Sequence, residues 1–117
     1  MIENIETYEK KLYDALVIFK QNNELTENLC ELFQELIEHN FTKRLPIFPS
    51  EEIKEDCESF ALLTCLESVK KFDPDKINPR TGVKINPRVY FSIVIRSALA
   101  GGYVKGKNHK KYFQNES

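Results

Sequence analysis

The sequence has no long hydrophobic run, and this absence argues against a membrane protein. No apolar stretch approaches the roughly 20 residues that a membrane-spanning helix needs, so we expect no membrane partner. The N-terminal stretch, MIENIETYEKK, is too acidic and mixed for a secretory signal. Together these features predict a cytoplasmic protein.

Histidine and cysteine, the residue types of zinc sites and of nucleophile pairs, are scarce, and we expect the plentiful carboxylates to be solvated on helix faces. The two histidines and three cysteines are His39, His109, Cys30, Cys57 and Cys65. They lack the spacings of a zinc site, and the cysteines lie in apolar stretches, so we expect buried, reduced thiols. No glycine-rich loop opens a helix as phosphate binding requires, since Gly101-Gly102 follow a predicted helix. We therefore expect no metal, no cofactor and no enzymatic activity.

Acidic residues are missing from one whole part of the chain. Residues 1–75 hold 17 acidic and 8 basic residues, whereas residues 76–115 hold nine basic residues and no acidic one. This separation favours two surfaces with different partners, a basic surface for a polyanion and an acidic surface for a basic protein. The alternative is that the two faces are solvated and attract each other within the fold.

Helical periodicity dominates the 117 residues, which are enough for one domain. Apolar residues recur at steps of three and four, and no useful stretch alternates as a half-buried strand does. The predicted helices span about 4–21, 25–40, 51–72 and 87–100. Prolines make 42–49 a loop, while Ser50 and Asn86 are the expected N-caps of the helices that follow them. We expect an all-α bundle of four to five helices over 1–105, with a basic flexible tail over 106–117.

The third predicted helix has the widest apolar face. Its apolar residues are Ile53, Cys57, Phe60, Ala61, Leu63, Leu66 and Val69. Such a wide face predicts a central, largely buried helix. The string KINPR then occurs twice, at 76–80 and 84–88, and we interpret it as a small tandem duplication within a loop.

Two segments resemble the second conserved region of bacterial sigma factors. The first segment is residues 56–76, DCESFALLTCLESVKKFDPDK. As in that sigma-factor region, an acid opens a helix that ends in Lys-Phe before an acidic turn. Residues 90–99, YFSIVIRSAL, are similar to the helix that captures the promoter −10 element, with Tyr90 and Arg96 at matching positions. Residues 86–90, NPRVY, look most like the compact late sigma factors of T-even bacteriophages. This resemblance implies a subunit that joins core RNA polymerase to promoter DNA in the host bacterial cytoplasm.

The chain departs from primary sigma factors in three ways. Phe72 and Tyr90 lie farther apart than in the family, and removing one eight-residue repeat unit restores the spacing. Ile93 and Val94 stand where primary sigma factors carry two tryptophans that trap an unstacked base, and this chain has no tryptophan. We also expect no helix-turn-helix segment for a −35 element. Promoter location would then require either another protein, such as a coactivator that supplies upstream recognition, or a single strong −10-like element.

The resemblance implies two sets of contact residues. Acids near the start of the third helix would bind the basic coiled coil of the polymerase clamp: Glu52, Glu55 and Asp56, together with Ser59. Promoter DNA would contact Arg88, Tyr90, Arg96, Lys105 and Lys107, the basic residues through phosphates and Tyr90 by stacking on an unpaired base. Phe60 replaces an acid that the family carries, and each acid could instead be solvated surface. Tyr90 could instead pack against the central helix.

Two other functions fit the same pattern. A phage protein of this fold could occupy the clamp and inhibit the host sigma factor without initiating transcription. A helical protein-interaction module unrelated to transcription is also possible. The acid-free basic segment favours initiation, because a pure inhibitor has no need of a DNA-facing surface.

Overall fold

Helices account for most of the chain in the computed structural model, which describes residues 2–43 and 50–98. They are α1 (Ile5–Asn22), α2 (Glu27–Lys43), α3 (Glu51–Val69) and a fourth helix over 87–98. No described residue belongs to a strand, and an isolated bridge joins Ile77 to Lys84. The predicted all-α bundle is therefore confirmed, whereas the predicted tail at 106–117 lies outside the described residues.

Each described helix begins at a polar side chain that accepts a backbone hydrogen bond. The four capping residues are Asn4, Thr26, Ser50 and Asn86. Their oxygens accept from the N–H group two or three residues further on, at distances of 2.9–3.2 Å. These bonds satisfy donors that the first turn of a helix leaves unpaired. The predicted caps at Ser50 and Asn86 are confirmed.

Two helix ends differ from the prediction. α2 continues past Asn40 to Lys43, because Phe41 is buried and extends the apolar face by another turn. α3 ends at Val69 and not near Phe72. The N–H of Phe72 bonds to Val69 O at 3.3 Å, a tighter turn than the α-helix makes. This turn carries the Phe72 ring toward the fourth helix.

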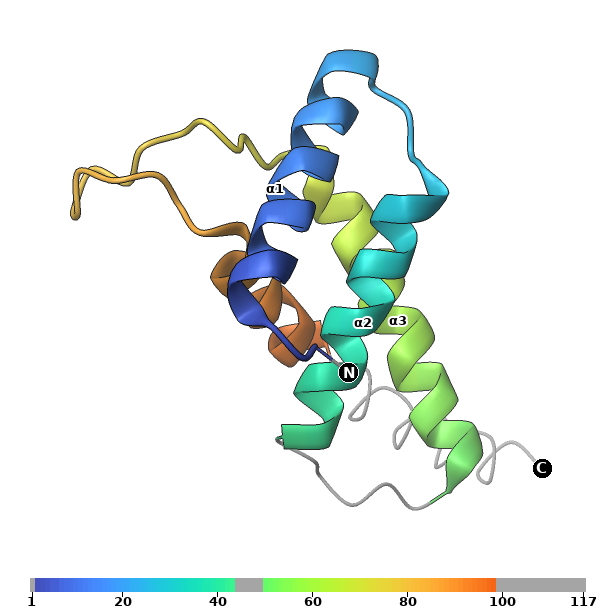
Figure 1. Ribbon diagram of the computed structural model, residues 1–117. Helices are drawn as coiled ribbons and strands as arrows, with labels where there is room; N and C mark the ends of the chain where they lie inside the picture. The colour runs from blue at the N-terminus through green and yellow to red at the C-terminus, as the bar shows by residue number, and fades with distance from the viewer. Residues whose placement is uncertain (1, 44–49, 99–117) are drawn as a thin grey trace, which may run out of the picture.

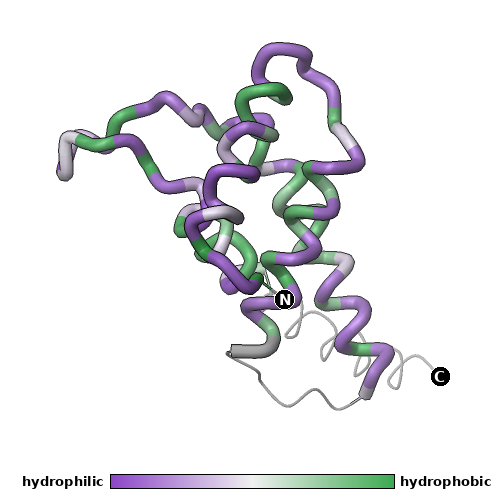
Figure 2. Tube along the Cα trace, in the orientation of Figure 1, coloured by the Kyte–Doolittle hydropathy of each residue, from purple (hydrophilic) through white to green (hydrophobic). Residues whose placement is uncertain are grey.

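The helices form a bundle with α2 in the middle. The chain rises through α1, descends through α2 and rises again through α3, and α2 contacts both neighbours (Figure 1). The helices carry both hydrophobic and hydrophilic residues along their length (Figure 2). In α1 and α2 the buried residues recur at steps of three and four, as amphipathic packing requires. Between α1 and α2, the buried hydroxyl of Tyr8 donates a hydrogen bond of 2.6 Å to Leu32 O. Burial raises the pKa of this phenol, which therefore stays a neutral donor.

The burial predicted for α3 is confirmed for part of its apolar face and is wrong at Leu63. Its buried residues form one row at steps of four: Cys57, Ala61, Cys65 and Val69. Leu63 is 59% exposed, and Phe60 and Leu66 are only half-buried. Small side chains fill the row that faces the core, while larger apolar side chains lie on the flanks. α3 therefore covers one side of the bundle and leaves a broad surface to solvent.

The fourth helix is held in place by aromatic contacts. Phe91 is fully buried, with its ring centroid 4.8 Å from that of Phe33 on α2 and 5.3 Å from that of Phe72. Tyr90 also contacts Phe72, at 4.8 Å. Aromatic rings at such separations add stabilisation beyond the area that they bury. The fourth helix therefore packs on α2 and on the turn that follows α3.

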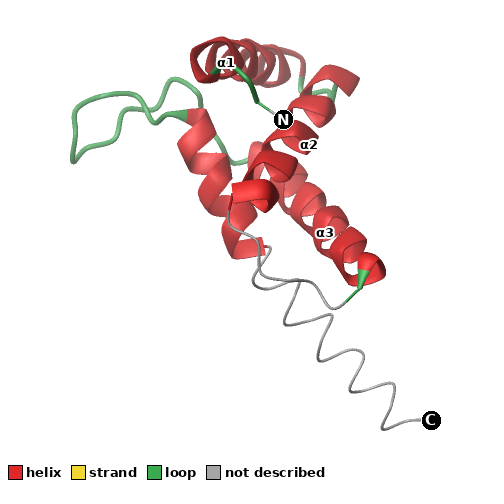
Figure 3. Cartoon of the chain, turned by 60° about the horizontal axis from the view of Figure 1, so that its bottom comes forward, coloured by secondary structure: helices red, strands yellow, loops and turns green. Residues whose placement is uncertain are grey.

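The loop between α3 and the fourth helix projects away from the bundle (Figures 1 and 3). Its base is tied to α1, because Lys20 Nζ lies 2.7 Å from Asp73 Oδ1 and the Tyr13 hydroxyl donates to Asp75 Oδ1 at 3.0 Å. Farther out, Ile85 N donates to Lys76 O at 3.3 Å. Lys76 and Ile85 are therefore neighbours across the neck of a short hairpin, which the sequence did not predict.

We predict that residues 77–84 are dispensable for folding. Deleting them joins Lys76 to Ile85, which already face each other, and leaves one KINPR copy before the fourth helix. Shortening a loop by this amount changes its closure entropy by less than about 1 kcal/mol. We expect thermal unfolding, followed by circular dichroism, to stay cooperative with a midpoint within a few degrees of the parent.

A Lys84→Ala variant is the matched control for this deletion. It removes the side chain that lies 3.4 Å from Asp75 and leaves the loop at full length. A deletion that abolishes the cooperative transition, when Lys84→Ala retains it, would show that the hairpin is needed for folding.

Candidate protein and nucleic-acid interfaces

The four predicted polymerase contacts lie together on the exposed side of α3. Glu52, Glu55, Asp56 and Ser59 are all exposed. Their spacing of three and four residues places them on one face of the helix, opposite the buried row that begins at Cys57. The core thus fixes the helix and leaves three carboxylates available to a basic partner.

An exposed leucine continues this acidic face toward the C-terminal end of α3. Leu63 follows Ser59 by one helical turn, so the two lie on the same side of the helix. The apolar pattern of the third predicted helix places Leu63 in the core, so Leu63 is absent from the predicted contact residues. The helical spacing from Glu52 through Asp56 and Ser59 to Leu63 was the signal that could have found it. A partner on this face would meet carboxylates followed by an apolar side chain.

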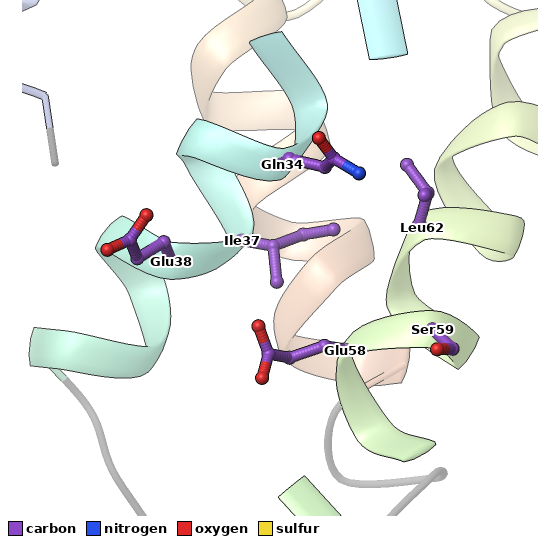
Figure 4. Close-up of a pocket in the computed structure, with 6 residues that line it drawn as sticks. All are labelled: Gln34, Ile37, Glu38, Glu58, Ser59 and Leu62. Atoms are coloured by element: carbon purple, nitrogen blue, oxygen red, sulfur yellow. The ribbon is translucent and has the colours of Figure 1, made fainter. Parts of the chain in front are cut away.

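A pocket of about 220 Å³ opens beside this face, between α2 and α3. It is lined by Gln34, Ile37, Glu38, Glu58, Ser59 and Leu62. Figure 4 shows Ile37 and Glu58 pointing into the space between the two helices. Ser59 therefore belongs both to the predicted contact face and to this acidic pocket. The arrangement fits a basic side chain that reaches between the helices.

The electrostatics of Glu58 differ from those of a freely solvated glutamate. Burial against α2 is the main cause that raises its pKa. Lys54 lowers this pKa, and three neighbouring carboxylates raise it again. They are those of Glu38, Glu51 and Glu55. A cationic partner would relieve this repulsion.

The cysteines of α3 are unsuited to nucleophilic chemistry. Cys57 and Cys65 are buried as predicted, while Cys30 on α2 is half-buried, and none forms a disulfide. Burial raises the pKa of Cys65 to about 12 and also raises that of Cys57. Because the thiolate is the reactive form, these side chains stay neutral and act as small apolar residues.

Arg88, a predicted DNA contact, is engaged within the fold. Its Nε lies 3.5 Å from Glu9 Oε1 on α1, and both side chains are only about a quarter exposed, at 28% and 26%. The Asn86 side chain donates a hydrogen bond to the same Glu9 carboxylate. Arg88 thus joins the start of the fourth helix to α1, and a phosphate would compete with Glu9 for it.

The exposed side of the fourth helix carries apolar residues beside Tyr90 and Arg96. Val89 and Ile93 are 43% and 54% exposed, whereas Val94 packs against the core. Tyr90 is half-buried, and its ring packs on Phe72 in the turn after α3, not on the helix itself. Arg96, also half-buried, donates from Nε to Ser92 O at 3.3 Å.

The remaining predictions concern two lysines, metal binding and membrane-spanning helices. Lys105 and Lys107 lie outside the described residues. Within 2–43 and 50–98, no three His, Cys, Asp or Glu side chains converge as metal ligands would. In the same part of the chain, no helix combines the length and the apolar character that crossing a membrane requires.

Comparison of this chain with protein-family models, with curated proteins and with solved structures gives no match. The residues and their geometry are therefore the basis for a functional proposal.

We predict that Glu58→Gln stabilises the fold at neutral pH. The pKa of Glu58 is higher in the folded chain than in the unfolded chain, so its ionised form weakens the folded state above that pKa. Below about pH 4, both states hold the proton and the difference disappears. Thermal unfolding should show a midpoint raised by about a few degrees at neutral pH, and no change in acid.

Glu67→Gln, at an exposed position farther along α3, is the control and should leave the midpoint unchanged. An equal rise in both variants would mean that a general change in charge, and not the site of Glu58, stabilises the chain.

Proposed function

We propose that this chain is a sigma-like transcription initiation factor, which binds core RNA polymerase and directs it to a −10-like promoter element in phage late transcription. The exposed acidic face of α3 supports this proposal most directly. This face presents Glu52, Glu55 and Asp56 near the start of α3. Just after the other end of α3, Phe72 contacts Tyr90 on the proposed DNA-binding helix. One rigid element would thus connect the polymerase contact to the DNA contact.

The proposed polymerase contact is electrostatic at its centre and apolar at one side. The basic coiled coil of the clamp would neutralise the three carboxylates and lie against Ser59 and Leu63. Burial of Leu63, now 59% exposed, would add an apolar contribution to binding. Neutralisation of the carboxylates around Glu58 would add a favourable electrostatic one.

The proposed DNA contact lies on the exposed face of the fourth helix. Ile93 is the side chain best placed to wedge between bases, since Val94 packs against the core. Tyr90 would stack on an unpaired base with the part of its ring that Phe72 leaves uncovered, and Arg96 would contact phosphate. Without further DNA-reading residues among those described, promoter choice would require the polymerase and a coactivator.

We predict that the double variant Glu55→Lys/Asp56→Lys loses binding to core polymerase. Both residues are exposed, so the helix should fold normally while two attractive charges become repulsive. Co-purification with core polymerase should fall by at least about tenfold, which corresponds to about 1.4 kcal/mol. Circular dichroism should stay unchanged.

Glu3→Lys/Glu24→Lys is the matched control, because it makes the same change in net charge at exposed residues outside the helices. Equal binding by both double variants would refute the α3 contact. Run-off transcription with the parent chain distinguishes the alternatives: initiation supports the proposal, inhibition indicates a clamp-occupying inhibitor, and no effect indicates an unrelated interaction module.

We predict that Ile93→Ala and Arg96→Ala impair promoter opening more than polymerase binding. Both side chains lie on the fourth helix and not on the acidic face of α3. Ile93 would act only once the strands part, and Arg96 would hold the phosphate backbone beside the opened bases. Permanganate footprinting should show reduced reactivity of thymines in the opened region, while co-purification with polymerase stays unchanged.

Tyr90 needs a more careful comparison, because Tyr90→Ala also removes a ring that packs on Phe72. Tyr90→Phe keeps this packing and the stacking surface, so it should retain the open region that Tyr90→Ala loses. If all the alanine variants leave the open region intact on every promoter tested, the fourth helix does not engage DNA.

A further inference from the structure

The hairpin of residues 76–85 is an ordered arm. Asn78 N donates to Val83 O at 2.8 Å, and Ile85 N donates to Lys76 O at 3.3 Å, on either side of the bridge between Ile77 and Lys84. At the tip, Gly82 N donates to Asn78 O at 2.8 Å. Gly82 has φ of 72°, a conformation that side chains disfavour. These bonds define the shape of a segment that projects from the bundle (Figure 3).

The arm carries basic charge that the fold leaves unpaired. Lys76, Arg80 and Lys84 are exposed, and no acidic residue occurs between Lys76 and the end of the described chain. Lys84 pairs with Asp75 at the base. Among the described residues, Lys76 and Arg80 form no ion pair. Arg80 therefore carries basic charge at the tip of the arm, while Lys76 is exposed at its neck, next to the acidic base.

The two KINPR copies form the same local turn, but their arginines have different surroundings. Asn78 Oδ1 accepts from Arg80 N at 2.9 Å, and Asn86 Oδ1 accepts from Arg88 N at 2.9 Å. Arg88 is then held by Glu9 within the fold, whereas Arg80 is exposed at the tip of the arm. The duplication thus adds a solvent-facing arginine in the same local setting as a structural one.

We propose that the arm binds the phosphate backbone of duplex DNA through Lys76 and Arg80. Its charge is complementary to a polyanion, and a two-stranded ribbon is narrow enough for the major groove of B-DNA. Ile77 and Val83 are 57% and 62% exposed, and near the sugars they would gain apolar contact. The inference rests on the proposed function only in the choice of DNA as the ligand.

The arm would supply affinity without reading sequence. Contacts to phosphate position a protein on DNA, whereas contacts to base edges specify the site. The arm lies directly before the fourth helix, so its binding would hold the duplex beside the helix that is proposed to engage the −10-like element.

The test measures the salt dependence of DNA binding by the full chain. Fluorescence anisotropy with a short labelled duplex of arbitrary sequence gives the dissociation constant over a series of salt concentrations. Each phosphate contact contributes about 0.9 to the slope of log affinity against log salt. Lys76→Gln/Arg80→Gln should therefore lower the magnitude of the slope by about two, and the deletion of 77–84 should do so by about one, because it retains Lys76.

Lys10→Gln/Lys11→Gln is the control, because it makes the same charge change at two exposed residues of α1. It should leave the slope unchanged. An equal reduction by both double variants, equal slopes for the parent and the arm variant, or no duplex binding by the parent even at low salt would each overturn the arm as a DNA contact.

Run-off transcription, performed in parallel, separates this inference from the proposed function. A parent chain that initiates transcription while the arm variant keeps the parental slope would refute the arm alone. A parent chain that does not initiate, but whose DNA binding depends on Lys76 and Arg80, would refute the initiation factor and leave the arm as a nucleic-acid contact.

Discussion

The burial of Phe91 between Phe33 and Phe72 is the contact on which the functional geometry depends. It joins the fourth helix to α2 and to the turn after α3, and it determines which side of the fourth helix faces solvent. Ile93 is exposed because Phe91 and Ile95 are buried. The tight turn that ends α3 at Val69 is part of the same arrangement, since it brings Phe72 into contact with both Tyr90 and Phe91.

Among the described residues, the ion pairs between distant segments lie at the base of the arm and at the start of the fourth helix. Lys20 pairs with Asp73 at the base of the arm, and Glu9 pairs with Arg88 at the start of the fourth helix. Such exposed or half-exposed pairs contribute little to stability, but they fix the direction in which a segment leaves the bundle. The acids near the start of α3, and Lys76 and Arg80 on the arm, remain available to partners of opposite charge.

The helices and their starts could be predicted from sequence, because periodicity and caps act over only a few residues. Ser50 and Asn86 cap their helices as expected. The burial of α3 could not be predicted, since seven apolar residues show that a helix can be buried but not which of them a neighbouring helix covers. Leu63 was assigned to the core for this reason. The exposure of Glu52, Glu55 and Asp56 could be predicted, because their spacing places them together on one face of the helix.

The repeated KINPR string shows what sequence by itself determined and what only the tertiary structure decided. Each Asn-Pro-Arg forms the same capped turn, because the asparagine oxygen and the N–H two residues later are close in any such chain. The residues after each turn determine how the chain continues. Gly82 at positive φ follows the first copy, and a helix follows the second. Whether the arginine is held or free depends on Glu9, which is distant in sequence and meets Arg88 only when α1 packs beside the fourth helix.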